Sequence, residues 1–182
     1  SVFADLAGPG DVAGSRGTGA ASSFLLLHRA PVKLLTFVWA QASADETMAA
    51  KHAVATLQAI AGALMIVFAY HLLLWSGLNT WNATLFAAVL GCSTTTLIFT
   101  ALPQVQIFSM LGITAMLTAM ARGRHARWWE FSCAALYSVL CSHWNLIPAI
   151  VLALVRGVHR WRISGSYKPI PAVLGSVSLL AI

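Results

Sequence analysis

The chain has 182 residues, of which 59% are hydrophobic and only 9% are charged. Soluble globular domains carry about 25% charged residues, so this composition excludes a soluble globular protein. The same apolar content excludes intrinsic disorder, and three cysteines are too few for a disulfide scaffold. The sequence therefore predicts an all-α integral membrane protein with one helical domain and a formal charge of +6.

The N-terminal part has two segments of different composition. Residues 1–22 are rich in Gly, Ala and Ser and predict an irregular arm outside the membrane. Residues 23–42 are apolar but include His28, Arg29 and Lys33. Because a charge at the bilayer centre is costly, we expect this segment to be amphipathic and to lie in the membrane interface, with its large apolar side chains dipping toward the lipid chains.

Residues 43–165 are apolar enough for a bundle of transmembrane helices. A capping box at Ser43 and Glu46 predicts the start of the first helix, and Pro148 predicts a kink in the last one. A helix of about 20 apolar residues is long enough to cross the hydrocarbon core. We predict about four spans, at residues 53–76, 83–102, 104–121 and 131–155. The remaining apolar segment, residues 166–182, is too short to cross.

An even number of spans, four, would place the chain before the first span and the chain after the last span on the same side of the membrane. Eight Lys and Arg residues then share that side, and three, Arg122, Arg124 and Arg127, lie on the other. Since positive charge is retained on the cytoplasmic or matrix side, both termini are predicted to face that compartment. In this arrangement six of the seven tryptophans lie at a membrane boundary, and Trp144 is the exception.

The second predicted span carries small residues at four-residue spacing, namely Ala83, Ala87, Gly91 and Thr95. In lipid, such stripes let two helix backbones approach closely. We therefore expect this stripe to pack against another helix, in this chain or in a neighbour. The alternative is a path for an ion or substrate lined by residues 93–96, but their hydroxyls can bond to carbonyls one turn back and need no ligand.

Two histidines within predicted spans, His71 and His143, are the candidate cofactor ligands. Two histidines from different helices can ligate a haem iron, but these lie at depths of about 8 Å and about 18 Å from the same boundary. Each could instead hold a haem or pigment together with a partner chain. His143 and Asn145 also form the most polar patch at mid-depth, which leaves a membrane-embedded transferase or transporter component as another alternative.

Basic clusters beside the spans predict contacts with anionic lipid headgroups rather than with nucleic acid. The residues concerned are Arg122, Arg124, Arg127, Arg156, Arg160, Arg162 and Lys168.

No Asp or Glu lies within any predicted span. Proton relays, cation-coupled carriers and metal-assisted transferases use carboxylates or other ionisable groups at membrane depth. We therefore predict a non-catalytic accessory subunit of a multi-subunit membrane complex, without a metal site. A respiratory or photosynthetic electron-transport assembly is the favoured class, and the partners would be other membrane subunits and anionic lipids.

The sequence begins at Ser1 rather than Met. We interpret this as a sign of a cleaved targeting segment or of a longer chain. This interpretation favours the mitochondrial inner membrane, with a thylakoid or bacterial plasma membrane as the alternatives.

Overall fold

The computed structural model describes residues 19–42, 45–101 and 106–164. All regular structure in these ranges is helical, as predicted, with seven α-helices and two short 3-10 helices. The α-helices are α2 (Gly19–Ala40), α3 (Glu46–Trp75), α4 (Thr80–Cys92), α5 (Thr94–Ala101), α6 (Gln106–Ala121), α7 (Trp128–Cys141) and α8 (Leu146–Ser164), and the 3-10 helices are η2 (Gly123–His125) and η3 (His143–Asn145).

Among the described helices, one is both long and apolar enough to cross a membrane, and it covers Thr47–Trp75 of α3. Three shorter apolar helices accompany it, at Thr80–Cys92, Gln106–Ala121 and Leu146–His159. By length and composition, the single long helix is a weak indication of membrane association.

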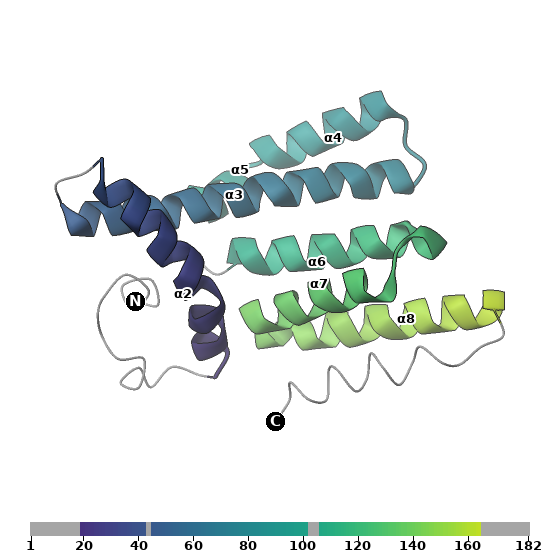
Figure 1. Cartoon of the computed structure of the whole chain (residues 1–182). Coiled ribbons are helices and arrows are strands. Elements are labelled where there is room, and N and C mark those ends of the chain that lie inside the picture. The colour runs from purple at the N-terminus through teal and green to yellow at the C-terminus, as the bar shows by residue number, and fades with distance from the viewer. Residues whose placement is uncertain (1–18, 43–44, 102–105, 165–182) are drawn as a thin grey trace.

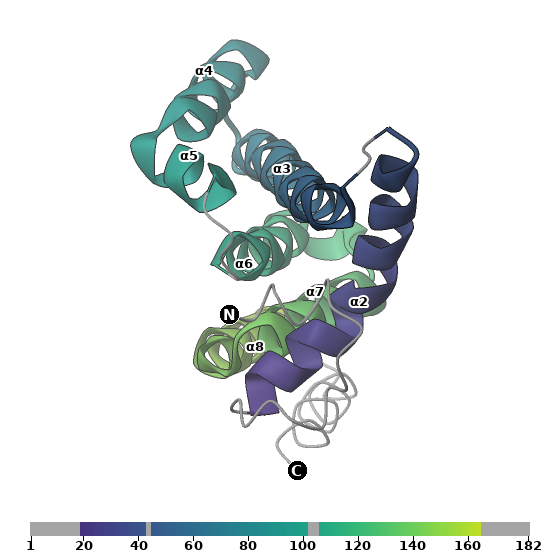
Figure 2. The same ribbon diagram turned by 90° about the vertical axis from the view of Figure 1, so that its left-hand side faces the viewer.

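The helices α3, α6, α7 and α8 lie side by side with their axes roughly aligned, and α4 and α5 lie beside α3 (Figures 1 and 2). Helix α2 crosses one end of this bundle at a steep angle. We call this end, where α3 and α6 begin and α7 meets α8, the α2 end. The opposite end holds the α3–α4 loop, the α6–α7 loop and the end of α8, and we call it the arginine end.

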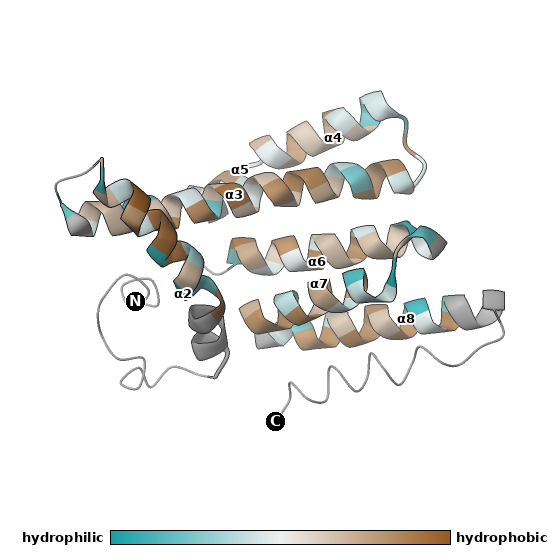
Figure 3. Ribbon diagram, in the orientation of Figure 1, coloured by the Kyte–Doolittle hydropathy of each residue, from teal (hydrophilic) through white to brown (hydrophobic). Residues whose placement is uncertain are grey.

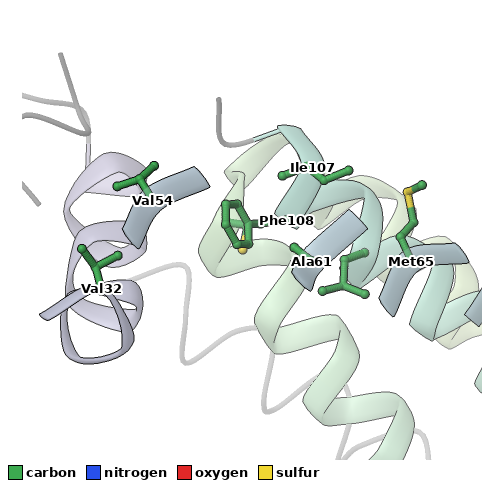
Figure 4. Packing of buried hydrophobic residues seen from close by; sticks show 8 residues of the cluster. Val32, Val54, Ala61, Met65, Ile107 and Phe108 are labelled. Carbon is green, nitrogen blue, oxygen red and sulfur yellow. The ribbon is translucent and has the colours of Figure 1, made fainter. Parts of the chain in front are cut away.

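A buried apolar cluster joins α2, α3 and α6 (Figure 4). Val32 of α2 and Val54 of α3 are both buried, and Phe108 of α6 belongs to the same cluster. Helices α6 and α7 are in close backbone contact, because a Cβ added to Gly112 would lie 2.7 Å from Cα of Ser138. Close backbone contact of this kind is how helices associate in lipid.

Most of the helical residues range from weakly to strongly hydrophobic, with hydrophilic positions scattered among them (Figure 3), and many large apolar side chains are exposed. Large exposed side chains include Leu64 and Val67 on α3, Val89 on α4, and Ile147 and Val151 on α8. In water such a surface would drive aggregation, whereas in lipid it costs nothing.

The second predicted span, residues 83–102, is not one continuous helix. The backbone turns out of helical geometry at Ser93, with φ −63° and ψ 142°, so that α4 ends and α5 begins there. The Ser93 hydroxyl accepts a hydrogen bond from the Thr96 amide at 3.3 Å and thereby caps α5. Average hydropathy could not reveal this break, because α4 and α5 are similarly apolar.

The fourth predicted span, residues 131–155, is wrong as a single helix. Helix α7 ends at Cys141, Ser142 is extended with φ −157°, and α8 runs back beside α7 as a hairpin. Pro148 is therefore not a kink. It lies in the first turn of α8, where a missing backbone N–H costs nothing because first-turn amides have no partner within the helix.

The N-terminal boundaries also differ from the predictions. Helix α2 begins at Gly19, so the last residues of the predicted irregular arm are helical, and the rest of that arm lies outside the described residues. Helix α3 is capped by Asp45, whose carboxylate accepts from the Thr47 amide at 2.9 Å. Ser43 of the predicted capping box and the C-terminal segment 166–182 also lie outside the described residues.

Candidate functional site

The predicted polar centre at Asn145 is a buried contact between helices. The Asn145 side-chain amide donates to Oγ of Ser109 at 2.6 Å and to the backbone oxygen of Ser138 at 2.9 Å. Asn145 is 7% exposed, so these bonds hold α6, α7 and η3 together inside the bundle. The hairpin places this contact at the α2 end instead of at mid-depth.

A second buried polar contact, which the sequence analysis missed, ties α2 to the bundle. Nε2 of His28 lies 3.3 Å from the hydroxyl of Tyr137 on α7, and its ring lies 4.6 Å from the ring of Phe108 on α6. His28 and Val32 are both buried and lie one turn apart, a spacing that indicates a common helix face. The sequence could have indicated this face but not the helix that covers it.

The structure separates the two candidate cofactor ligands. His71 is exposed on α3, four residues before Trp75, and so lies close to the arginine end. The backbone of His143 lies at the start of η3, at the α2 end, and its side chain is not among those described. Because axial ligands of one haem must meet at one level, these two histidines cannot share an iron within this chain.

Arg156, predicted to bind lipid headgroups, lies inside the bundle instead. It is 5% exposed, and its guanidinium donates to the backbone oxygens of Ala119 at 3.2 Å and Ala126 at 2.9 Å. The rings of Trp128 and Phe131 lie 4.9 and 5.1 Å from its central carbon. The guanidinium therefore satisfies carbonyls at the end of α6 and in the following loop, and two aromatic faces stabilise its charge.

The other predicted headgroup residues cluster at the arginine end as far as they are described. Arg122 is partly exposed and pairs with Glu130 at 2.7 Å, and Arg127 is exposed. The backbones of Arg124, Arg160 and Arg162 also belong to this end, but their side chains are not described, and Lys168 lies outside the described residues.

The small-residue stripe contacts α3 along part of its length. Ala83 and Ala87 are buried, and a Cβ added to Gly91 would lie 2.9 Å from Cδ1 of Ile66. Thr95 does not continue the stripe and is exposed, because the break at Ser93 changes the direction of the chain.

The described residues contain no group of three or more His, Cys, Asp or Glu side chains that could hold a metal ion. Cys92 and Cys133 are exposed and Cys141 is buried, and all three are free thiols.

No known protein family, no curated protein and no solved structure matches this chain.

Proposed function

We propose that the chain is a non-catalytic, membrane-embedded subunit of a larger membrane complex, as its composition indicates. It acts through helix packing and lipid contact, and a respiratory or photosynthetic electron-transport assembly is the first class to test. Two features support this proposal. The buried side chains of Asn145, Thr118 and Arg156 bond to other parts of the same chain, and polar groups beside the break between α4 and α5 are exposed.

Three buried polar side chains bond to other parts of this chain. Asn145 joins three elements, Thr118 donates to the backbone oxygen of Phe68 at 2.9 Å, and Arg156 donates to loop carbonyls. A substrate site needs polar groups that converge on open space. These groups converge on other helices instead, which supports a structural role.

The observation that carries the proposal is the break between α4 and α5. Gly91 touches Ile66, which lies midway along α3 between Thr56 and Trp75. Thr56, which accepts a hydrogen bond from Trp39, and Trp75 lie toward opposite ends of α3. At 1.5 Å per residue, Thr56 and Trp75 are about 28 Å apart, close to the thickness of the hydrocarbon core. The break at Ser93 therefore lies near the bilayer centre.

Exposed polar groups accompany this break. Thr94 and Thr95 are both exposed, and they contribute the first two amides of α5, which have no partner within the helix. Non-helical backbone at membrane depth is tolerated only where protein or a water-filled cavity covers it. A helix of a neighbouring subunit with a polar side chain would supply that cover.

The experiment is extraction of native membranes in mild detergent, followed by native electrophoresis, mass spectrometry and an absorption spectrum of the band. We expect co-migration with other membrane subunits. Migration as a lone monomer would overturn the proposal, and absorbance that is lost when His71 is replaced would favour a pigment- or haem-binding subunit instead.

A pair of variants locates the contact. Thr95→Trp places a large ring at the exposed break and is expected to release the chain from the complex. Val151→Trp makes the same addition on an exposed apolar face of α8 and should leave the complex intact. Equal retention of both variants would show that the break is not a subunit contact.

A further inference from the structure

The directions of the helices show how many times the chain passes from one end of the bundle to the other. Helix α3 runs from the α2 end to the arginine end, and α4 with α5 returns (Figure 1). Helix α6 runs forward again, α7 returns, and α8 runs forward to end beside the α6–α7 loop. The bond from Arg156 to Ala126 joins α8 to that loop and fixes this direction. The number of passes is therefore five, which is odd.

The tryptophans mark two boundaries at the ends of these passes. Trp39 lies near the end of α2, and Trp144 lies in η3 between α7 and α8, so both belong to the α2 end. Nε1 of Trp39 donates to the hydroxyl of Thr56 on α3 at 3.1 Å. At the arginine end, Trp75 is the last residue of α3 and Trp81 is the second residue of α4. Trp128, Trp129 and the backbone position of Trp161 fall at this end too. In the four-span arrangement, Trp144 is the tryptophan that does not lie at a membrane boundary. Because α7 and α8 form a hairpin, Trp144 lies at the turn between them and therefore at a boundary.

Exposure supports this assignment of the boundaries. Trp144 is 73% exposed and Trp81 is 70% exposed, although both are large apolar rings. Tryptophan is enriched at headgroup level on both sides of a membrane. Two belts about 28 Å apart along α3 correspond to the two faces of one bilayer.

Charge distinguishes the two ends. In the described ranges, the arginine end carries Arg122, Arg124, Arg127, Arg160 and Arg162 besides the buried Arg156, and a single acid, Glu130. The α2 end carries three cations and two acids, namely Arg29, Lys33, Lys51, Asp45 and Glu46. Short loops with the larger number of Lys and Arg stay on the cytoplasmic or matrix side.

We infer that the chain crosses the membrane five times, with the arginine end against the anionic leaflet of the cytoplasmic or matrix side and α2 on the opposite surface. The inference rests on the proposed membrane-embedded role. It replaces the arrangement expected from four spans, in which the chain before the first span and the chain after the last span lie on the same side of the membrane. The short helix α7, of 14 residues, requires local thinning of the bilayer, which membranes accommodate at modest cost.

The test is the accessibility of single cysteines in sealed vesicles of known orientation, with the assembled complex in its native membrane. The three native cysteines are replaced by alanine, and single exposed positions are changed in separate variants: Gln41→Cys, Trp144→Cys, His125→Cys and His159→Cys. A charged, membrane-impermeant maleimide is the probe.

We expect His125→Cys and His159→Cys to be labelled from the cytoplasmic or matrix side, and Gln41→Cys and Trp144→Cys from the other. Labelling of His159→Cys from the same side as Gln41→Cys would restore an even number of crossings and overturn the inference. The five-crossing pattern with its two sides exchanged would overturn the charge assignment.

Carbonate washing of the membranes separates this result from a failure of the proposed function. A chain released by carbonate is not embedded, so the proposed role and the inference both fail. A chain that resists carbonate and co-migrates with its complex, but gives the even pattern, refutes the inference alone. A variant enters the comparison only if it still co-migrates with the complex, and a second exposed position at the same end, Ser76→Cys or Ala42→Cys, replaces one that does not.

Discussion

At the scale of single residues, the burial of an arginine in this bundle depends on whether backbone carbonyls can accept its hydrogen bonds. Arg156 and Arg127 belong to the same end of the bundle, yet one is buried and the other is exposed. The buried guanidinium is retained because it has carbonyl partners and two aromatic faces, since an unpaired charge at such a site would be too costly. Its contribution is therefore to stability rather than to lipid binding.

Replacement of these two arginines tests that difference. Arg156→Met keeps much of the side-chain length but removes the donors to Ala119 and Ala126. We expect it to lower the free energy of unfolding in detergent by about 2–3 kcal/mol, as for hydrogen bonds to a charged group. Arg127→Met removes an exposed charge and should change it by less than about 0.5 kcal/mol. Equal effects of the two substitutions would contradict a buried structural role.

At the scale of elements, two serines interrupt helices that apolar composition alone would continue. Ser93 is the extended residue between α4 and α5, and Ser142 is the extended residue after α7. Serine competes for backbone hydrogen bonds and so favours caps and turns over helix interiors. The first interruption leaves Thr94 and Thr95 exposed beside the break, and the second turns a predicted span into a hairpin.

The cap at the first interruption can be tested directly. Ser93→Ala removes the hydroxyl that accepts from Thr96 and donates to the Leu90 carbonyl. We expect a loss of about 1 kcal/mol in thermal or denaturant unfolding, the usual cost of removing an N-cap. Thr84→Ala is the matched control, because its hydroxyl bonds only to the carbonyl of Thr80 within α4. A control that loses as much as Ser93→Ala would show that Ser93 is not a cap.

At the scale of the whole molecule, the proposed membrane position rests on the two tryptophan belts and on the apolar faces between them. Trp39 and Trp144 lie at the α2 end, and Trp75, Trp81 and Trp129 lie at the arginine end. Large apolar side chains are exposed on the helices between these ends. Association between such faces depends on close contact and polar bonds rather than on burial from water.

Tryptophan fluorescence in brominated lipids tests this placement. If the rings lie at headgroup level, lipids brominated near the carbonyl end of the acyl chain should quench the emission more than lipids brominated near the methyl end. The Trp144→Phe and Trp81→Phe variants show whether both belts contribute. Strongest quenching by bromines near the methyl end would place the rings at the bilayer centre and contradict the two boundaries.

The extent of sequence-based prediction can be judged from particular elements. The helical class follows from the long uncharged apolar runs, because a helix satisfies every interior backbone group within its own segment when no water is available. The predicted third span, residues 104–121, agrees with the helix α6, Gln106–Ala121. The predicted second and fourth spans are each interrupted, at Ser93 and Ser142, because hydropathy does not detect a change of backbone direction at a single serine.

In the candidate site, too, the sequence indicates single residues but not the residues that they contact. Asn145 could be singled out because a polar residue among apolar ones is visible in the sequence. Its partners Ser109 and Ser138 could not, since they lie on two other elements. The packing of His28 against Tyr137 likewise joins residues that are 109 positions apart.

The sequence by itself determined the helical class, the apolar character of the surface and the absence of acidic residues from the predicted spans, because these are properties of composition and local pattern. Only the tertiary structure decided the number of passes, the burial of Arg156 and the position of Trp144. Each of these depends on whether the chain turns back at Ser142, and that turn is favoured by contacts between α7, α8 and the α6–α7 loop, which no local pattern specifies.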